Sequence, residues 1–518
     1  MRVFATSFAV VLFFFTAGAS QAAAVFDFPN PPGPYKVGLQ VVHQYDKARA
    51  WRGEIDPVSG QRNEGETARP VQTLVWYPAT GLGKPLVYGD YLRLIGSEDD
   101  FTRSAQAAEK VADSVVRRAY LSESGPVQGQ AALAGAMRAR LDAAAAKGRF
   151  PVVIYAPSIS APAMENADLC EYLASHGYIV LASPSIGTRA REMASDLEGA
   201  ETQAADIAFL IRHAHGLPNA DVRRLAVAGY SWGGLANVLA AAKDRRIKAL
   251  VGLDGSVRAY PELLAEAKYV TPLTIRVPML YVAGRPASIE QLAARKKAVS
   301  GFLDDIRYAD LYKLTMHPME HFAFSSTYLR FASDGMFNQY PRAEVNRAHG
   351  WTAEYVLRFL DAYLKRDAAA KAWLDAPPSS HGMPAHAVTM EARPAAAAPA
   401  GREELAAELA RHGFEHVHTA YAAMRTRDKT FSLRESELND WGYQLLNRGE
   451  PQQAIHIFKL ATFLYADSAN AYDSLADACE QAGDTAAAIE NYRRSLQLDP
   501  GNKNAEARLG VLDPHRKT

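Results

Sequence analysis

The feature that most constrains the fold is a short glycine-rich segment, GYSWGG, at residues 229–234. It follows an apolar, β-branched run at 224–228 and leads into a helix-length segment at 233–242. A chain that passes from a buried strand to a helix through so tight a turn needs flanking glycines, because the turn strains the backbone and leaves little room for side chains. The segment therefore predicts a strand, a sharp turn and a helix.

Similar apolar runs recur along the first two thirds of the chain. We expect strands at residues 36–43, 72–77, 151–155, 178–182, 224–228, 247–253, 277–283 and 311–316. Helix-length segments separate the later runs, at 166–176, 201–213, 233–242 and 351–364. Continuous apolar strands alternating with helices indicate an α/β fold with a mostly parallel sheet covered on both faces. The first two runs have no helix between them, so we expect them to form an antiparallel edge.

The rest of the chain divides by composition. We assign residues 25–370 to the α/β domain, and within it residues 90–148 to a helical insertion, Ala-rich and charged, that could cap a site. Residues 371–401 contain PAAAAPAG and are expected to be an Ala/Pro-rich linker. Residues 402–518 have a wholly helical pattern.

The helical tail repeats itself with a period of 34 residues. Seven positions of the first copy return in the second, from Leu438, Trp441 and Gly442 to Tyr472, Leu475 and Ala476, and so on to Ala461 and Ser495. This period, with small residues at the expected helix crossings, predicts a small all-α domain of tetratricopeptide helix pairs. Such a domain could bind a protein partner or serve self-association.

The N-terminus has the pattern of a secretory signal peptide at residues 1–24. Arg2 precedes an apolar run at 3–15, and small residues at 17–24 offer cleavage after Ala22 or Ala24. The run is shorter than the roughly 20 residues that span a bilayer, so we expect no transmembrane anchor. The pattern predicts a periplasmic or secreted protein.

The charge balance and the cysteine content exclude several other classes of protein. Lys+Arg and Asp+Glu both number 57, so nothing points to nucleic acid as a partner. Cys170 and Cys479 are the only cysteines and give no disulfide framework. We find no complete metal-ligand pattern, no phosphate-binding glycine loop and no dinucleotide fingerprint, and we expect no cofactor and no metal.

Three residues in chain order could form a nucleophile, acid and base. Ser231 lies at the tip of the predicted turn, in a G-x-S-x-G element whose strand and helix match a nucleophile elbow. Asp254 follows the next strand, whereas no acid stands within the residues that follow the strand after it. A turn-forming Asp-Gly is the plain alternative for Asp254. His321 and His317 are both candidates for the base, and His321 is preferred because its loop is long enough to reach Ser231.

An oxyanion hole for this serine would be built from backbone amides. One is expected from Trp232, the residue after the nucleophile, and the other from the loop APSISA at 156–161. Ile159 is the first choice in that loop and Ser160 the next. Side chains matter little at such positions.

At these residues the chain resembles the dienelactone-hydrolase-like α/β hydrolases, and more closely their platelet-activating-factor acetylhydrolase-like branch. The resemblance covers roughly residues 35–366 and is carried by VWYP at 75–78, the YAPSIS loop, HGYIVLASP at 176–184, GYSWGG, LDG at 253–255 and HFAF at 321–324. The branch implies an acid after the strand that follows the nucleophile helix, which agrees with Asp254. Pro157 and Ser158 stand where the family usually has His-Gly, and dienelactone hydrolases proper use cysteine where this chain has Ser231. The tail, at about 430–512, resembles the tetratricopeptide appendage of some bacterial hydrolases.

The combined expectation is an exported serine hydrolase that cleaves small-molecule or lipid-like carboxylic esters through an acyl-enzyme. A peptidase or amidase using the same three residues is an alternative. A second alternative is an interaction protein that acts through its repeats.

Overall fold

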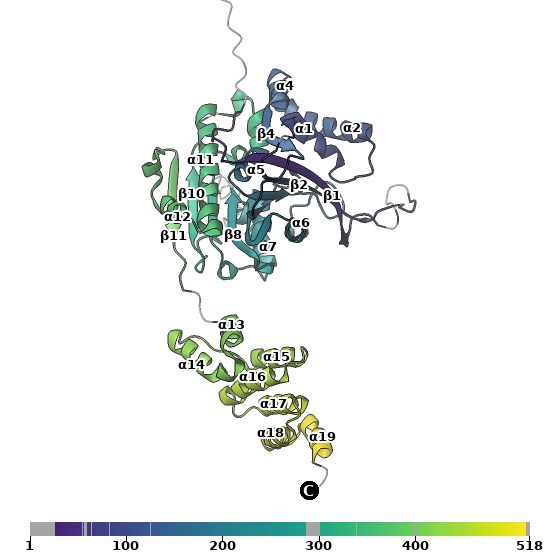
Figure 1. Cartoon of the computed structure of the whole chain (residues 1–518), viewed down its shortest axis with the longest axis vertical. Helices are drawn as coiled ribbons and strands as arrows, with labels where there is room; N and C mark the ends of the chain where they lie inside the picture. The colour runs from purple at the N-terminus through teal and green to yellow at the C-terminus, as the bar shows by residue number, and fades with distance from the viewer. Residues whose placement is uncertain are drawn as a thin grey trace, which may run out of the picture. The chain divides into compact units, whose positions relative to one another are not determined.

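The first unit, Met1–Ala396, is built around a sheet that has eleven strands in its described part (Figure 1). The computed structural model describes residues 26–53, 55, 60–63, 65–81, 83–124, 126–285, 301–337, 339–397 and 401–513. The predicted signal peptide, residues 1–24, therefore lies outside the described residues. The strands are β1 Lys36–Ala50, β2 Ala68–Ala79, β3 Lys84–Val87, β4 Ala136–Leu141, β5 Phe150–Ala156, β6 Ile179–Ala182, β7 Ala220–Tyr230, β8 Ile247–Leu253, β9 Met279–Ala283, β10 Leu311–Met316 and β11 Val388–Arg393.

The strands lie in the order β11-β10-β9-β8-β7-β5-β6-β2-β1-β4-β3. From β6 to β10 all neighbours are parallel, whereas β1 and β2 pair antiparallel over twelve residue pairs. Parallel neighbours place their carboxyl ends at one edge of the sheet, where the connecting turns can bring distant residues together. The predicted fold class, a mostly parallel sheet flanked by helices, is confirmed.

Both faces of the sheet are buried. Alternate residues of β5 belong to two separate hydrophobic clusters, Val153 and Tyr155 to one and Val152 and Ile154 to the other. Helices α5 Ala167–Ser175 and α11 Arg342–Leu360 contribute to the first cluster. Helices α6 Leu197–His215 and α7 Trp232–Lys243 contribute to the second. This two-sided burial explains why the central strands are apolar throughout rather than alternating.

Three strands, β3, β4 and β11, lie where the sequence predicted none. Strand β4 falls inside residues 90–148, so this segment is not wholly helical, and it pairs with β1, which is therefore not at the edge. Strand β11 falls inside residues 371–401 and pairs with all of β10, so most of this segment belongs to the first unit and is not a linker. Strands β4 and β11 are short and each has a single buried residue, because a strand near an edge buries few of its side chains.

The insertion is otherwise helical. It contains α1 Tyr88–Arg93, α2 Ala105–Val116, a π-helical turn at Arg117–Leu121 and α4 Pro126–Ala134. The ring of Tyr120 packs against Tyr328 and Phe331 of α10, which spans Ser326–Phe331. The insertion therefore packs against the segment that follows His321.

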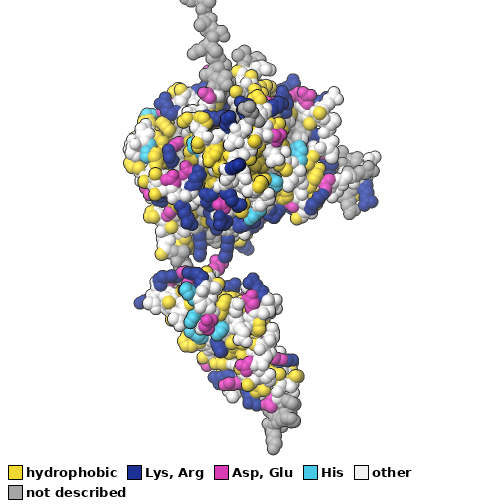
Figure 2. Space-filling model, viewed as in Figure 1, with side chains coloured by type: hydrophobic (Ala, Val, Ile, Leu, Met, Phe, Trp, Pro, Cys, Tyr) yellow, Lys and Arg dark blue, Asp and Glu magenta, His cyan; other side chains and the backbone are white. Residues whose placement is uncertain are grey.

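The second unit, Ala397–Thr518, consists of helices in its described part. They are α13 Arg402–His412, α14 Val417–Arg427, α15 Glu435–Leu446, α16 Pro451–Leu464, α17 Ala469–Gln481, α18 Thr485–Leu498 and α19 Lys503–Leu512. The pairs α15–α16 and α17–α18 are the two copies of the 34-residue repeat. Gly442 lies at the first crossing, where a Cβ atom would come within 2.2 Å of the Phe458 ring. Lys, Arg, Asp and Glu side chains are interspersed on the face of this unit that Figure 2 shows.

No helix in the described ranges is both long and apolar enough to cross a membrane. Cys170 and Cys479 are both free and buried, one in each unit.

Candidate active site

Ser231 stands between the end of β7 and the start of α7, in strained backbone geometry. Its φ is 54° and its ψ is −116°, a region that side-chain-bearing residues rarely adopt. Glycines on either side allow this turn. A Cβ atom on Gly229 would come within 2.4 Å of the Gly233 backbone, and one on Gly233 would come within 2.1 Å of the Ala156 carbonyl oxygen. The start of α7 therefore packs directly on the loop that follows β5.

His321 connects Ser231 to Asp254. Its Nε2 lies 2.9 Å from Ser231 Oγ, and its Nδ1 lies 2.7 Å from Asp254 Oδ2. A carboxylate only accepts hydrogen bonds, so Nδ1 carries the proton and the Nε2 lone pair faces the serine hydroxyl. The side chain of His321 is half exposed, whereas Ser231 and Asp254 are buried. The structure thus brings the three sequence-predicted residues into one hydrogen-bonded row.

Asp254 is held by several donors. Arg258 Nη2 donates to its Oδ1 at 2.9 Å and the Gly284 amide donates to the same oxygen at 3.2 Å. Burial by itself would raise the pKa of Asp254, but the hydrogen bond from His321 and the charges of His321 and Arg258 outweigh it and lower the pKa below its usual value. Asp254 is therefore ionised at neutral pH, and its Oδ2 can accept the Nδ1–H of His321.

The two histidine candidates lie in different places. His317 Nε2 is 3.1 Å from Thr389 Oγ1 on β11, at the exposed side of that strand pair. His321 begins a 3-10 turn, His321–Phe324, and its carbonyl oxygen accepts the Tyr230 hydroxyl at 2.9 Å. The Tyr230 ring also lies against the imidazole, with centroids 5.1 Å apart. Only His321 is brought to Ser231.

The amides proposed for the oxyanion hole can be compared in the same way. Trp232 is the first residue of α7, so its N–H has no acceptor within the helix. In the loop after β5, the Ser158 amide donates to Glu165 Oε2 at 2.8 Å and is already used. The Ile159 amide has no acceptor among the residues that the structure describes. This leaves the backbone amide of Ile159 free to donate to an oxyanion, and Ser160 is the next residue in the loop.

This loop is held by polar contacts on several sides. Gln203 Nε2 donates to the Pro157 carbonyl at 2.8 Å, and the Met193 amide donates to Ser160 Oγ at 2.8 Å. Ser160 needs such support because its φ is 56°. Its position thus depends on the segment around residues 185–193.

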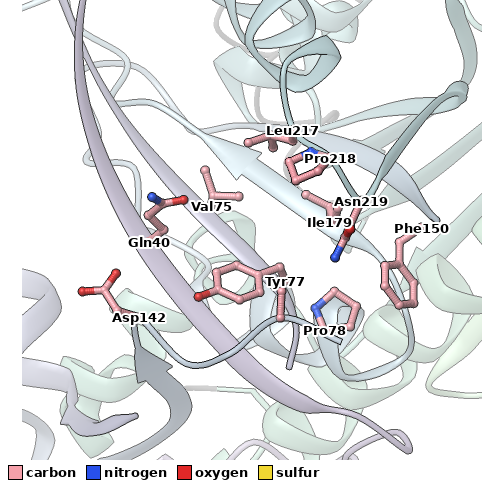
Figure 3. A pocket seen from close by; sticks show the side chains of 11 residues that line it. Gln40, Val75, Tyr77, Pro78, Asp142, Phe150, Ile179, Leu217, Pro218 and Asn219 are labelled. Atoms are coloured by element: carbon pink, nitrogen blue, oxygen red, sulfur yellow. The ribbon is translucent and has the colours of Figure 1, made fainter. Parts of the chain in front are cut away.

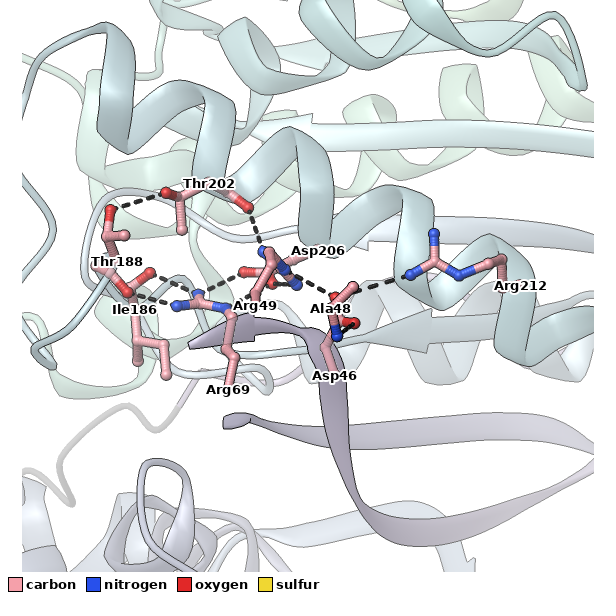
Figure 4. A network of polar contacts seen from close by, with 10 residues as sticks. Asp46, Ala48, Arg49, Arg69, Ile186, Thr188, Thr202, Asp206 and Arg212 are labelled. Atoms are coloured by element: carbon pink, nitrogen blue, oxygen red, sulfur yellow. Dashed lines mark hydrogen bonds and ion pairs between the residues drawn. The ribbon is translucent and has the colours of Figure 1, made fainter. Parts of the chain in front are cut away.

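That segment is in turn fixed by the buried ionic network in Figure 4. Arg69 binds both carboxylate oxygens of Asp206 at 2.7 and 2.8 Å and donates to the Ile186 carbonyl at 2.9 Å. Burial would raise the pKa of Asp206, but the charges of Arg69 and Arg49 lower it below its usual value. Loss of Arg69 would leave the Asp206 carboxylate as an uncompensated buried charge, so the ion pair resists disruption. The hydrogen bond from Arg69 to the Ile186 carbonyl connects this pair to the segment around residues 185–193.

A cavity of about 330 Å³ lies at the amino-terminal ends of the parallel strands, away from the ends that carry Ser231 and Asp254 (Figure 3). Phe150 and Ile179, which line it, begin β5 and β6, whereas Ser231 and Asp254 follow the ends of β7 and β8. It is therefore separate from the row of Ser231, His321 and Asp254.

Metal ligands are not gathered in the parts of the chain that the structure describes. No group of three or more His, Cys, Asp or Glu side chains there could hold a metal ion.

Sequence models of two known families match parts of the chain. Residues 132–266, which include Ser231 and Asp254, match the sequence model of the chlorophyllase family, and residues 469–512 match a tetratricopeptide repeat. The first unit has the α/β-hydrolase fold. A ferulic acid esterase from Streptomyces cinnamoneus, solved at 2.4 Å resolution, is similar in structure. It is 21% identical, with a TM-score of 0.49, and the match covers 70% of this chain and 98% of that chain. No curated protein matched the chain.

Two residues of the α/β-hydrolase site were not found from the sequence. Arg258 lies four residues after Asp254, a spacing that could have indicated an ion pair. Glu165 lies in a mostly apolar stretch, APAMENADL at 161–169, and is one of two acids there, which is a visible but weak signal. Its partner Ser158 could not be named without the fold.

Proposed function

We propose that the chain is an exported serine hydrolase that cleaves carboxylic esters through an acyl-enzyme. The observation that carries the proposal is the position of His321, 2.9 Å from Ser231 Oγ and 2.7 Å from Asp254 Oδ2. The chlorophyllase-family match supports an esterase-type hydrolase over other uses of the fold.

The reaction would begin with attack of Ser231 Oγ on the ester carbonyl carbon. His321 Nε2 takes the hydroxyl proton, and Asp254 stabilises the imidazolium that forms. The carbonyl oxygen becomes an oxyanion that accepts hydrogen bonds from the Trp232 and Ile159 amides. As the intermediate collapses, the alcohol leaves with the proton from His321.

The second half of the reaction would release the acid. Water attacks the acyl group on Ser231 while His321 Nε2 takes a proton from the water. The bond from the carbonyl carbon to Ser231 Oγ breaks, and the serine recovers its proton from His321. Atoms and protons balance without a cofactor.

Substrate choice follows from the resemblance to the dienelactone-hydrolase-like and acetylhydrolase-like enzymes. We propose small-molecule or lipid-like esters, to be distinguished by p-nitrophenyl esters of increasing acyl length. Matching p-nitroanilides test the peptidase or amidase alternative. Turnover of anilides at rates equal to those of esters would contradict the assignment as an esterase.

The decisive experiment labels the purified mature chain with a fluorophosphonate probe. Wild type and His317→Ala should be labelled, whereas Ser231→Ala and His321→Ala should not, because only these two lack the nucleophile or its base. His317→Ala is the matched control, since His317 stands four residues from His321 and contacts Thr389 instead. A folded wild type that takes no label would contradict the proposal.

We also propose that the chain is exported to the periplasm or beyond after removal of residues 1–24. The support is the charged start, the apolar run and the small residues before Val25. N-terminal sequencing of the protein from the periplasmic fraction should begin at Ala23 or Val25. A protein that keeps Met1 would contradict export.

The repeats of the second unit support a further proposal, that this unit binds a protein partner or a second copy of the chain. Light scattering of the full chain would separate self-association from binding to another protein.

A further inference from the structure

Glu165 is a buried acid next to the proposed oxyanion loop. It is 2% exposed and lies between β5 and α5. Its Oε2 accepts the Ser158 amide at 2.8 Å, and its Oε1 accepts the Ser158 hydroxyl at 2.5 Å. One carboxyl group therefore holds both polar donors of Ser158, the residue directly before Ile159.

The backbone of the same residue holds the segment that follows His321. The Glu165 carbonyl oxygen accepts the Thr327 amide at 3.2 Å and the Thr327 hydroxyl at 2.9 Å. The neighbouring Asn166 Oδ1 accepts the Ser326 amide at 2.8 Å. These contacts fix the start of α10, which follows the His321–Phe324 turn.

The choice of oxyanion donor depends on the first of these contacts. If the Ser158 amide were free, it could compete with Ile159 for the oxyanion. Because Glu165 occupies it, the Ile159 amide is the first free donor after β5. An oxyanion donor must stand within about 0.5 Å of its place to be effective, so the loop needs rigid support.

We propose that Glu165 is a positioning residue for the esterase reaction: its side chain orients the oxyanion loop while its carbonyl anchors the segment that carries His321. The proposal rests on the function proposed above. Glu165 is not assigned contact with the substrate. It acts through Ser158 on one side and through Thr327 on the other.

The electrostatics of Glu165 fit this role. Burial raises its pKa to about 7, although the Ser158 hydrogen bonds and the charge of His321 act in the opposite direction. A fixed anion beside the oxyanion would oppose its formation, and a carboxyl that is partly protonated at neutral pH opposes it less than a full anion would. The ionisable groups near enough to influence it, or to be influenced by it, are His321, Tyr88, Tyr120, Tyr155, Tyr230 and Tyr328.

The test compares Glu165→Gln with Glu165→Ala in the full mature chain. Gln keeps an acceptor for the Ser158 amide and offers a donor to its hydroxyl, so kcat should stay within about 3-fold of wild type. Ala removes both contacts, and kcat should fall about 100-fold, as on loss of one oxyanion donor, while KM changes less than about 3-fold. The substrate is a p-nitrophenyl ester, with active sites counted by the fluorophosphonate probe.

Glu171 offers a matched control. It is buried to the same degree, its pKa is also raised by burial to about 7, and it too accepts one hydroxyl and one amide, from Tyr91 at 2.7 Å and Arg138 at 2.8 Å. Glu171→Ala should lower the melting temperature about as much as Glu165→Ala does but leave kcat within about 3-fold of wild type. An equal loss of kcat in Glu171→Ala would show that the effect is general destabilisation and would overturn the proposal.

A further variant covers the case in which Glu165→Ala does not fold. Ser158→Ala removes only the hydroxyl contact and should lower kcat by about 5- to 10-fold with KM unchanged, since about one hydrogen bond of support is lost. Unchanged kcat in this variant, or in a folded Glu165→Ala, overturns the proposal, as does a Glu165→Gln as impaired as Glu165→Ala. A wild type without label and without ester turnover would instead reject the proposed function itself.

Discussion

The orientation of the His321 ring depends on a single pair of atoms, His321 Nδ1 and Asp254 Oδ2. Asp254 Oδ2 accepts the Nδ1–H of His321 while Oδ1 is held by Arg258 and Gly284, so the carboxylate has little freedom to turn. Its backbone is left-handed, with a φ of 42°, which fixes the side chain above the end of β8. The imidazole is therefore oriented by one oxygen in a fixed position.

Asp254→Asn should lower kcat about 10³- to 10⁴-fold with KM nearly unchanged. The amide can donate to Nδ1, which would move the imidazole proton to Nε2 and leave no lone pair for Ser231. Steady-state kinetics on a p-nitrophenyl ester measure both constants. If the decrease were less than about 10-fold, another acid would have to orient His321.

Glu171 leads to a prediction about stability and pH. Burial raises its pKa from 4.5 to about 7 in the folded chain. Between these pH values the folded chain keeps a proton that the unfolded chain has released, so stability falls as pH rises from about 4.5 to about 7 and then stays level. Glu165 adds a second group of the same sign.

Glu171→Gln removes one of these groups. In wild type the free energy of unfolding decreases between pH 4 and pH 8. In Glu171→Gln this decrease should be smaller by about 3 kcal/mol, the equivalent of roughly 2.5 pKa units. Urea unfolding at both pH values measures it. The comparison uses the change with pH, because Gln also alters the contacts to Tyr91 and Arg138 in a pH-independent way. Equal pH dependence in variant and wild type would contradict a raised pKa.

At the scale of elements, the central strands could be predicted because they are apolar on both faces. The same pattern also predicted the turn at Ser231 and the position of Asp254 after β8, because each of these residues comes directly after the end of a strand. His321 could be preferred but not fixed, because its distance to Ser231 depends on how β10 continues. Glu165 could not be found, since its partner Ser158 is defined by the path of a loop.

Strands β4 and β11 were missed for a related reason. Each has only one buried residue, and each owes its place to backbone hydrogen bonds with a neighbour far away in sequence. Within an Ala/Pro-rich stretch the short run VTMEAR carries no clear periodic signal. Composition therefore predicted a linker where the chain adds a strand to the sheet.

Strand β11 can be tested by truncation. A chain that ends after residue 376 loses all six pairs between β10 and β11, whereas one that ends after residue 396 keeps them. The shorter chain should be less stable by several kcal/mol, at about 1 kcal/mol for each ladder hydrogen bond lost, and more prone to aggregate through the bare edge of β10. Melting temperature and light scattering compare the two chains. Equal stability would mean that residues 377–396 are a linker after all.

For the whole molecule, the hydrophobic clusters predict how the chain unfolds. Among the described residues, the third cluster draws only on residues 405–512, and the other two only on residues 26–390. Each unit thus has a core of its own, which is the usual requirement for independent folding. The second core is also built from neighbouring repeats, as in the hydrogen bond from Tyr443 to Asp477, 34 residues apart.

Calorimetry of the mature chain should therefore show two transitions rather than one. A chain of residues 25–396 should reproduce one of them within a few degrees, and a chain of residues 397–518 the other, because neither core borrows residues from the other unit. Leu438→Ala, which opens a cavity in the second core, should lower only the transition of the repeats. If Leu438→Ala lowered both transitions equally, the two units would unfold as one cooperative structure, and a ligand of the repeats could then stabilise the hydrolase domain as well.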